Sequence, residues 1–391
     1  MDLSLSAKTS LPNDGTAGTL IARVWVPGAA AGPTVVLLRG EDVHALGIAT
    51  SSELMEADDP AALARACVRE RLGSIAEILA NSALGPRDAR APHFLAPIDL
   101  QAIKAAGVTF MRSLLERVIE EQTKGDPSAA ERVRHTLARE IGADLASVRP
   151  GSEAAQRLKQ ALIERGLWSQ YLEVGIGPDA EIFTKAQPMS AIGTGAEIGL
   201  HPASSWNNPE PEVALVANSR GTIVGATLGN DVNLRDFEGR SALLLGKSKD
   251  NNGSAAIGPF IRLFDRSFTL DDVRATTVDL TVEGDDGFVL RGESTMREIS
   301  RDPAELVAQM MGGVHQYPDG VVLYCGTMFA PTEDRGAKGE GFTHKLGDRV
   351  TIAAPKLGAL VNRINHSDRI PPWRFGSAAL MRNLARRGLL S

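Results

Sequence analysis

Two short apolar runs separated by a turn constrain this chain more than any other part of its sequence. The first run spans residues 213–216, the polar turn Asn-Ser-Arg-Gly occupies 218–221, and the second run spans 222–227. Apolar runs of this length on either side of a glycine-containing turn predict a β-hairpin. The register of a hairpin determines which side chains of its two strands meet.

Three carboxylates lie where this hairpin would bring them together. Glu210 and Glu212 open the first strand, and they share a face because alternate residues of a strand point the same way. With the turn centred on residues 219–220, Glu210 pairs with Gly229, and Asp231 falls just beyond. Three hard oxygen ligands with no Cys or His between them suit Mg²⁺, Mn²⁺ or Ca²⁺ better than zinc or copper. The alternative is that the two glutamates only line a solvated sheet edge.

The composition excludes several classes of partner. The chain has 391 residues, 43% of them hydrophobic and 23% charged, which is ordinary for a soluble globular protein. Its net charge of -6 provides no positive field for nucleic acid or an anionic membrane. Its 2 cysteines have no metal or disulfide spacing, and no apolar run approaches the ~18 residues that span a bilayer. We therefore expect a cytoplasmic protein that binds neither nucleic acid nor membranes.

The order of the predicted elements divides the chain into two domains. A smaller N-terminal α/β domain, residues 1–98, combines short apolar runs typical of strands with a helical pattern over 59–83. Residues 99–391 form the second domain. It begins with a strongly helical stretch from 99 to about 172, which includes a helical excursion over about 113–172. The many charges of these helices are expected to face solvent.

Beyond residue 175 the sequence changes to short apolar runs punctuated by glycines, which indicates that the second domain is mostly β. The predicted strands are 180–184, 213–216, 222–226, 255–261, 277–282, 288–292 and 321–325. Helices are predicted over 302–311, with a proline in the first turn, and over 377–389. The predicted fold class is therefore α+β.

Several common catalytic motifs are absent or incomplete. Gly246-Lys247-Ser248 is similar to the end of a phosphate loop, but 6 residues separate it from Gly239 where the motif needs four, which excludes ATP binding by such a loop. No GxSxG or HExxH segment supports a serine hydrolase or a zinc protease. Lys247 follows Asp231 and could hold an anionic oxygen of a substrate near the carboxylates. Otherwise it is a surface lysine at a strand end.

Six segments, in their order along the chain, resemble the fumarylacetoacetate hydrolase superfamily. They are Glu210-Pro211-Glu212, Gly229-Asn230-Asp231-Val232 with Arg235, 246–250 leading to Gly258-Pro259, Cys325-Gly326-Thr327, 347–350, and 357–358 with Asn362. The resemblance runs from about residue 96 to 361. It implies a mixed β-roll in the second domain, 2-oxo acid substrates, and a Mg²⁺ site formed by Glu210, Glu212 and Asp231. By position it makes Lys247 the active-site lysine and assigns Thr327 to the substrate carboxylate.

One segment departs from the hydrolytic members of that superfamily. They carry G-x-N-Y-x-x-H-x-x-E, and in the similar stretch 107–116 Ser113 takes the place of the histidine while Glu116 keeps that of the glutamate. Without the imidazole, general-base activation of water is not supported. This departure, the Thr-Phe-x-Arg-Ser pattern around Arg112, and the lead-in at 204–208 resemble the subgroup of 2-keto-3-deoxy-D-xylonate and 2-keto-3-deoxy-D-arabinonate dehydratases.

The resemblance implies a metal-dependent hydro-lyase of oxidative pentose catabolism. It would convert a 2-keto-3-deoxy pentonate, a small-molecule 2-oxo sugar acid, to 2,5-dioxopentanoate (α-ketoglutarate semialdehyde). The implied catalytic residues are Glu116 as the base, Ser113 beside the leaving group and Lys247 beside the enolate, and the implied substrate-binding residues are Arg112, Arg235, Thr327 and Asn230. The alternatives are a C–C bond hydrolase of an acylpyruvate or 2,4-diketo acid and a non-catalytic sugar-acid binding protein. We also expect a homodimer or homotetramer, because most soluble oligomers are symmetric assemblies of one chain.

Overall fold

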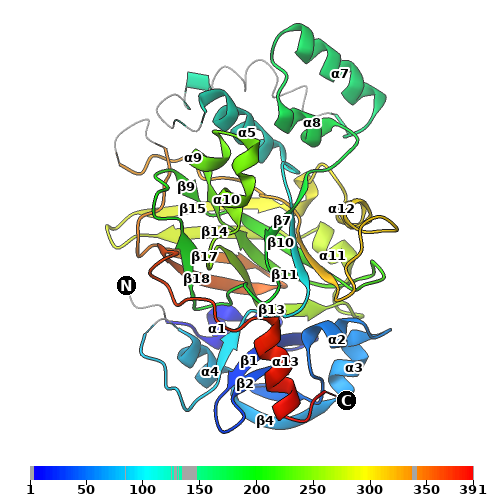
Figure 1. The fold of residues 1–391 in the computed structure, drawn as a ribbon, viewed down its shortest axis with the longest axis vertical. Helices are drawn as coiled ribbons and strands as arrows, with labels where there is room; N and C mark the ends of the chain where they lie inside the picture. The colour runs from blue at the N-terminus through cyan, green and yellow to red at the C-terminus, as the bar shows by residue number, and fades with distance from the viewer. Residues whose placement is uncertain are drawn as a thin grey trace.

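The computed structural model describes residues 4–83, 85–124, 126, 130, 132–133, 148–336 and 341–390. Strands occupy the centre of the molecule, with helices at both ends of its long axis and further helices beside the strands (Figure 1). Much of the predicted excursion, at 125, 127–129, 131 and 134–147, lies outside the described residues. In the part of the chain that the structure describes, no helix combines the length and apolar character needed to cross a bilayer.

A large mixed sheet of 11 strands runs through the molecule. Its strand order is β4-β3-β2-β1-β13-β11-β10-β16-β6-β7, and β5 also pairs with β1. All neighbours are antiparallel except β16 and β6, which are parallel. The strands are β1 (Leu20–Val26), β2 (Gly32–Arg39), β3 (Asp42–Leu46), β4 (Val68–Ser74), β5 (His93–Leu95), β6 (Ala102–Ala106), β7 (Ile182–Ala186), β10 (Pro211–Ala217), β11 (Ile223–Asp231), β13 (Ala255–Leu263) and β16 (Val321–Tyr324).

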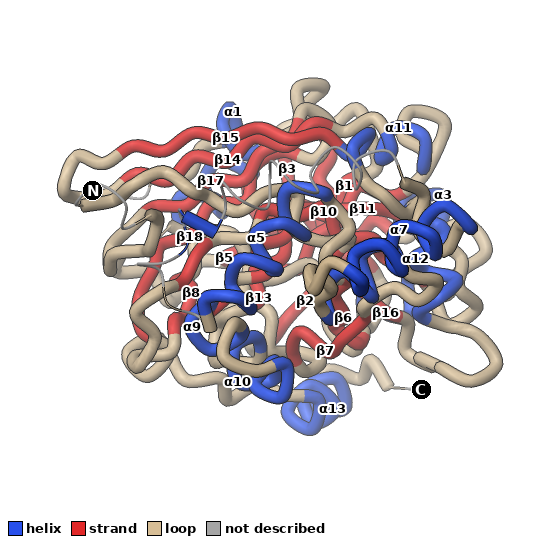
Figure 2. The backbone as a smooth tube through the Cα atoms, turned by 90° about the horizontal axis from the view of Figure 1, so that it is seen from above, coloured by secondary structure: helices blue, strands red, loops and turns tan. Residues whose placement is uncertain are grey.

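Two smaller sheets complete the β structure. A 5-stranded sheet has the order β15-β14-β17-β18-β8, and β9 and β12 form a 2-stranded ribbon. These strands are β8 (Glu197–Leu200), β9 (Asn207–Asn208), β12 (Asn233–Leu234), β14 (Thr277–Glu283), β15 (Val289–Thr295), β17 (Arg349–Ala354) and β18 (Gly358–His366). Seen from above, β14, β15, β17 and β18 run side by side along one side of the molecule (Figure 2).

The helices are mostly short. They are α1 (Ala7–Ser10), α2 (Ser51–Met55), α3 (Pro60–Ala66), α4 (Ile75–Ser82), α5 (Met111–Thr123), α7 (Glu153–Glu164), α8 (Gln170–Ile176), α9 (Arg235–Glu238), α10 (Leu245–Lys249), α11 (Leu270–Arg274), α12 (Pro303–Met310) and α13 (Ser377–Arg386), with 3₁₀ turns at Ala242–Leu244 and Met296–Glu298. The predicted C-terminal helix is α13, and the helix predicted over 302–311 is α12, whose Asp302 N-cap accepts a hydrogen bond from the Ala304 N–H.

Strand β10 is buried on both faces because two separate cores pack against it. Leu215 contributes to the core shared with Leu280 and Ile352 of the 5-stranded sheet. Val216 points to the other side, into a core that also contains Leu54 of α2. Each fully buried Leu or Val side chain contributes about 1.5–3 kcal/mol, so the hairpin sits in a rigid setting.

The predicted hairpin is present, but its register differs from the prediction. The turn has three residues instead of two, since the Asn218 N–H bonds to the Thr222 carbonyl over 3.0 Å. A bulge after Val216 then shifts the strands by one more position. The two shifts place Glu212, not Glu210, opposite Gly229. The prediction of Glu210 opposite Gly229 was therefore wrong.

Two predicted helical stretches contain strands instead. The helix predicted over 59–83 is broken by β4, which pairs with β3, and α4 restarts after Gly73, whose φ is +154°. The start of α4 carries a Ser74–Glu77 capping box, a signal that the apolar spacing obscured. The helical stretch predicted from 99 begins with β6, which pairs with β16 and β7. Tertiary pairing overrode local periodicity in both places.

The first strand of the N-terminal region is not separate from the rest of the fold. β1 pairs with β13, with Leu20 opposite Arg262 and Ile21 opposite Ile261. The N-terminal region and the hairpin therefore belong to one continuous sheet. This large sheet crosses the predicted boundary between residues 98 and 99. The division into domains at residues 1–98 and 99–391 stays a prediction.

The close approach of two strands at Gly229 generates a prediction about stability. A Cβ added at Gly229 would overlap the ring of Tyr324, whose hydroxyl donates to the Ala256 carbonyl over 2.8 Å. We expect Gly229→Ala to lower the free energy of unfolding by about 1–3 kcal/mol, the usual cost of overpacking a core. Gly246→Ala in α10, where an added Cβ meets nothing within 4 Å, is the control and should be neutral or stabilising. Equal unfolding curves for the two variants would contradict the packing at Gly229.

Candidate metal and substrate site

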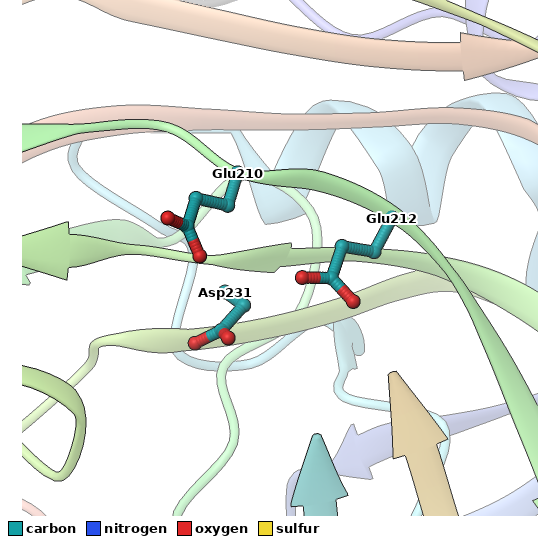
Figure 3. Close-up of side chains that lie close together, drawn as sticks. All are labelled: Glu210, Glu212 and Asp231. Carbon is teal, nitrogen blue, oxygen red and sulfur yellow. The ribbon is translucent and has the colours of Figure 1, made fainter. Parts of the chain in front are cut away.

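Glu210, Glu212 and Asp231 form one acidic cluster. One carboxylate oxygen from each lies within 4.8 Å of the others, and all three residues are buried. Figure 3 shows the two glutamates projecting from one chain segment toward the strand that carries Asp231. The structure thus brings together the three residues predicted to bind the metal, and the alternative of a solvated sheet edge is wrong.

The corrected register makes this cluster tighter than the sequence predicted. The Asp231 N–H donates to the Glu210 carbonyl over 3.1 Å, so these residues are direct cross-strand neighbours. The Asn230 side chain accepts the Glu210 N–H over 2.9 Å through its Oδ1. Asn230 therefore fixes the backbone ahead of β10. A contact between Asn230 and the substrate stays a prediction.

Lys249 joins two of the carboxylates. Its Nζ lies 2.7 Å from Glu210 Oε2 and 3.0 Å from Asp231 Oδ2, and it is 2% exposed. Burial opposes its charge, but Asp231 and Glu210 outweigh burial and raise the pKa of Lys249. The ammonium group is therefore held protonated beside the acidic cluster.

The sequence pointed to the wrong lysine of this helix. Lys247 is exposed, and its Nζ lies 5.0 Å from the centre of the Phe237 ring, away from the carboxylates. Lys247 and Lys249 are two residues apart in α10, and two residues of an α-helix are rotated by about 200°. The sequence analysis predicted no helix over this segment. Recognising it as a helix would have shown that only one of the two lysines can face the cluster.

A second lysine lies beneath Asp231. The Lys185 Nζ in β7 is 2.9 Å from Asp231 Oδ1 and donates to the carbonyls of Val232 and Lys249 over 3.0 and 2.8 Å. Burial raises the pKa of Asp231, but Lys185 and Lys249 outweigh this and lower it. Asp231 is therefore ionised, and its strand is tied to the end of α10. The sequence analysis did not single out Lys185.

Helix α5 crosses the acidic cluster with three charged residues. Arg117 forms an ion pair with Glu210, and its Nη1 donates to Glu120 over 2.7 and 2.9 Å. Glu116 and Glu120 each accept from Arg235, both at 2.7 Å. The expectation that the charges of these helices face solvent was wrong here, because Arg117 and Glu120 are 5% and 0% exposed. Their spacing of three and four residues indicates one helix face, a signal that the prediction did not use.

Glu212 is oriented by the segment that follows β16. Its Oε2 accepts the Gly326 N–H over 2.6 Å, and its Oε1 lies 3.3 Å from the Thr327 hydroxyl. Thr327 was predicted to bind the substrate carboxylate, and the structure places its hydroxyl beside a carboxylate of the cluster. The predicted Cys325-Gly326-Thr327 segment therefore contributes directly to the geometry of the site.

A cavity of about 490 Å³ opens beside α5. Exposed Arg112 and buried Glu116 both line it, together with 291–293 and 329–333. Ser113 is also buried and lies one helical turn before Glu116. Arg112 and Glu116 of the predicted trio on α5 therefore line this cavity, and Arg235 connects Glu116 to the ionic network of the cluster.

The charges of the described residues around the cluster do not balance. Seven carboxyl groups, Glu116, Glu120, Glu181, Glu210, Glu212, Asp231 and Glu238, face four basic groups, Arg117, Lys185, Arg235 and Lys249. Burial, reinforced by Asp231 and Glu210, raises the pKa of Glu212 well above its usual value. Burial also raises the pKa of Glu238, and that of Glu181 to about 7. The excess of carboxyl groups over basic groups and the all-oxygen donor set fit a divalent cation such as Mg²⁺.

The fold and the acidic cluster identify the family. The model of the fumarylacetoacetate (FAA) hydrolase C-terminal family matches residues 159–365, more than half of the chain, and the chain belongs to this family. The matched region contains the whole acidic cluster and both lysines that contact it. The predicted superfamily, and the α+β fold with a mixed β-roll, are thereby confirmed.

Two curated relatives are dehydratases by name. The chain is 31% identical over 193 residues to 2-dehydro-3-deoxy-D-arabinonate dehydratase of Saccharolobus solfataricus, covering 49% of this chain and 60% of the relative. It is 29% identical over 201 residues to the probable 2-keto-3-deoxyxylonate dehydratase of Haloferax volcanii, covering 51% of this chain and 65% of the relative. The matched region is thus less than two thirds of the length of either relative.

The solved structures extend the fold comparison to nearly the whole chain. A 2-keto-3-deoxy-D-arabinonate dehydratase complexed with magnesium and 2,5-dioxopentanoate superimposes with a TM-score of 0.60. The superposition covers 89% of this chain and 99% of the other, at 21% sequence identity. At this identity the likeness establishes the fold, while substrate and chemistry have to be argued from the site.

The buried position of Lys249 generates a stability prediction that separates the two lysines of α10. Lys249→Met leaves Glu210 and Asp231 without a shared counter-ion, so we expect it to lower the free energy of unfolding by about 3–5 kcal/mol in metal-free buffer. Lys247→Met, the control on the exposed side of α10, should change it by less than about 0.5 kcal/mol. Chemical denaturation measures both. A larger loss for Lys247→Met would show that the prediction from sequence had identified the right lysine.

Proposed function

We propose that this protein is a Mg²⁺-dependent hydro-lyase that removes water from a 2-keto-3-deoxy pentonate of the D-xylonate or D-arabinonate type, giving 2,5-dioxopentanoate. The observation that carries the proposal is the buried convergence of Glu210, Glu212 and Asp231 on one face of a rigid hairpin. The names of the two curated relatives support the reaction class and the type of sugar acid. Oxidative pentose catabolism is the context in which such a reaction would serve.

The three carboxylates of the cluster would hold the ion. Mg²⁺ is the metal proposed because of the oxygen ligands, and Mn²⁺ or Ca²⁺ would find the same donors. A divalent ion bound there would polarise the carboxylate and ketone oxygens of a 2-oxo acid and make its C3 hydrogen more acidic. Lys249 brings a fixed positive charge to the same place, where it stabilises negative charge developing on the C2 oxygen. We therefore assign to Lys249 the role that the sequence gave to Lys247.

Glu116 is the proposed proton-transfer group. Its carboxylate takes the proton from C3 as the C3–H bond breaks, and returns it to the C4 hydroxyl as the C4–O bond breaks and water leaves. The resulting C3=C4 enone loses a proton from C5 and gains one at C3, which forms a C4=C5 enol. Tautomerisation of that enol gives the aldehyde at C5. Arg235 holds Glu116 in place over 2.7 Å, and Ser113 lies one helical turn away to assist the leaving hydroxyl. Arg112, at the cavity mouth, would contact the sugar hydroxyls.

The proposed roles of the other polar groups follow from their contacts. The Thr327 hydroxyl and the Gly326 N–H lie against Glu212, so a substrate carboxylate near Glu212 would meet donors from this segment. Arg235 acts through Glu116 and Glu120, which makes it a positioning residue instead of a direct substrate ligand. The expected homodimer or homotetramer and the cytoplasmic location stay predictions.

Product analysis tests the proposed reaction. The protein, incubated with a panel of 2-keto-3-deoxy pentonates and Mg²⁺, should release one five-carbon aldehyde acid and no pyruvate. Activity should disappear in excess chelator and return with Mg²⁺. Glu212→Gln, which removes a metal ligand, should lose activity while keeping the wild-type fold by circular dichroism. Release of pyruvate with a second acid would instead identify a C–C hydrolase, and binding without turnover would identify a binding protein.

The proposed base makes a separate prediction. Glu116→Gln keeps the side-chain volume and can still bond to Arg235, but it cannot carry the proton. We expect turnover to fall by about 10²–10⁴-fold with a small change in KM. Glu121→Gln on the same helix, which replaces a carboxylate bonded to Ser169, is the control and should keep activity. Unchanged turnover in Glu116→Gln would show that another group moves the proton.

A further inference from the structure

The acidic hairpin continues beyond the metal ligands as one ribbon. β9 and β12 pair Asn208 with Asn233, and β10 and β11 pair Glu212 with Gly229. Both pairs have the same register, so the ribbon is continuous through the acidic cluster. Three cross-strand pairs follow one another along it: Asn208 with Asn233, Glu210 with Asp231, and Glu212 with Gly229. Just beyond the ribbon, Arg235 at the start of α9 contacts Trp206.

The side chains of these pairs share one face. Cross-strand partners point to the same side of a ribbon, and alternate residues along each strand do so as well. Beyond the end of the ribbon, the Arg235 guanidinium lies over the Trp206 ring at 4.1 Å. The intervening Val232 and Leu234 lie in the hydrophobic core on the opposite face. The asparagine pair is therefore the next pair along from Glu210 and Asp231.

The two asparagines are buried with unpaired polar atoms. Asn208 and Asn233 are both 0% exposed. Among the described residues, Asn233 Oδ1 and Nδ2 and Asn208 Oδ1 have no hydrogen-bond partner, while Asn208 Nδ2 donates to the Pro209 carbonyl over 2.8 Å. Buried donors and acceptors are rarely left unpaired, because each loses its bonds to water. Three such atoms on facing side chains indicate a polar ligand.

The asparagine pair lies between the metal ligands and the proposed base. Helix α5 is anchored to the ribbon on both sides of the pair, through Arg117 at Glu210 and through Glu116 at Arg235. Two residues along a strand span about 7 Å. A five-carbon acid whose first two carbons lie at the acidic cluster would extend its remaining carbons toward this pair.

We propose that Asn208 and Asn233 form a subsite for the distal hydroxyl groups of the substrate, and that this subsite selects polyhydroxylated 2-oxo acids over acylpyruvates and diketo acids. The proposal rests on the proposed function, because it names what the same site recognises. A carboxamide both donates and accepts, as a hydroxyl does, and it carries no charge. An apolar acyl chain would leave all three atoms unpaired, and a second carboxylate, which only accepts, would leave both Oδ1 atoms unpaired. A site built to bond a hydroxyl rejects analogues that lack it.

The test is Asn233→Leu, which keeps the number and branching of the side-chain heavy atoms and removes both polar atoms. We expect the KM for 2-keto-3-deoxy-D-xylonate to rise about tenfold, the effect of losing hydrogen bonds to a hydroxyl. The inhibition constant of 2-oxopentanoate, which has no hydroxyl, should stay within about twofold. The Tm of the ligand-free protein should stay the same or rise, because an apolar replacement removes unpaired buried groups. If Asn233→Leu does not fold, the same two constants are measured for Asn208→Leu, which changes the asparagine on the facing strand.

Asn362→Leu is the matched control. Asn362 is also buried, but its Nδ2 donates to the carbonyls of Gly193 and Ala196 over 2.9 and 3.1 Å. Asn362→Leu should lower the Tm, but it should not change the ratio of the KM for 2-keto-3-deoxy-D-xylonate to the inhibition constant of 2-oxopentanoate.

The proposal is decided by comparing how much each variant weakens the binding of 2-keto-3-deoxy-D-xylonate and of 2-oxopentanoate. If Asn233→Leu and Asn208→Leu weaken both ligands equally or change neither, the asparagines are structural and the proposal is wrong. If the wild type turns over none of the sugar acids, the proposed function fails, but the comparison remains possible. In that case, thermal shifts of the protein with Mg²⁺ and each ligand measure whether it binds the hydroxylated acid more tightly than 2-oxopentanoate. Loss of this preference in Asn233→Leu supports the subsite. A preference that persists in Asn233→Leu overturns it.

Discussion

The site depends on one short hydrogen-bonded contact, between the Asp231 N–H and the Glu210 carbonyl. It places the two residues directly across the hairpin, so that one ammonium group, Lys249, reaches both carboxylates. A shift of one residue would turn Asp231 to the opposite face, because side chains alternate along a strand. The three-residue turn and the bulge after Val216 together shift the pairing by two positions, which keeps Asp231 on the face of the glutamates and brings it directly opposite Glu210.

The cluster is held in the interior by charges from distant parts of the chain. Lys185 of β7 and Arg117 of α5 each pair with a different carboxylate of the cluster. Buried charges are costly unless they are paired, so these contacts rigidify the site more than they stabilise the fold. The remaining excess of carboxyl groups over basic groups leaves the cluster suited to a divalent ion. The network also connects the cluster to Glu116, so that the proposed metal ligands and the proposed base belong to one ionic structure.

The two faces of the hairpin serve different purposes. Leu215 packs against the second sheet, while the face of Glu210 carries the polar pairs. The ribbon that extends the hairpin past the cluster adds Asn208 and Asn233 to that polar face, under the same helix that covers the carboxylates. The chemistry of the substrate's first carbons and the recognition of its last carbons would then be set by consecutive pairs of one ribbon.

The sequence by itself determined the hairpin, the two glutamates on one face and the proximity of Asp231, because alternation and turn composition are local properties of a strand. It also indicated the family, through motifs that have a fixed order. Only the tertiary structure decided the register, the choice of Lys249 over Lys247 and the burial of Arg117. A bulge, the rotation between two residues of a short helix and the packing of one helix over a sheet all depend on contacts between segments far apart in the chain, and local spacing carries no information about them.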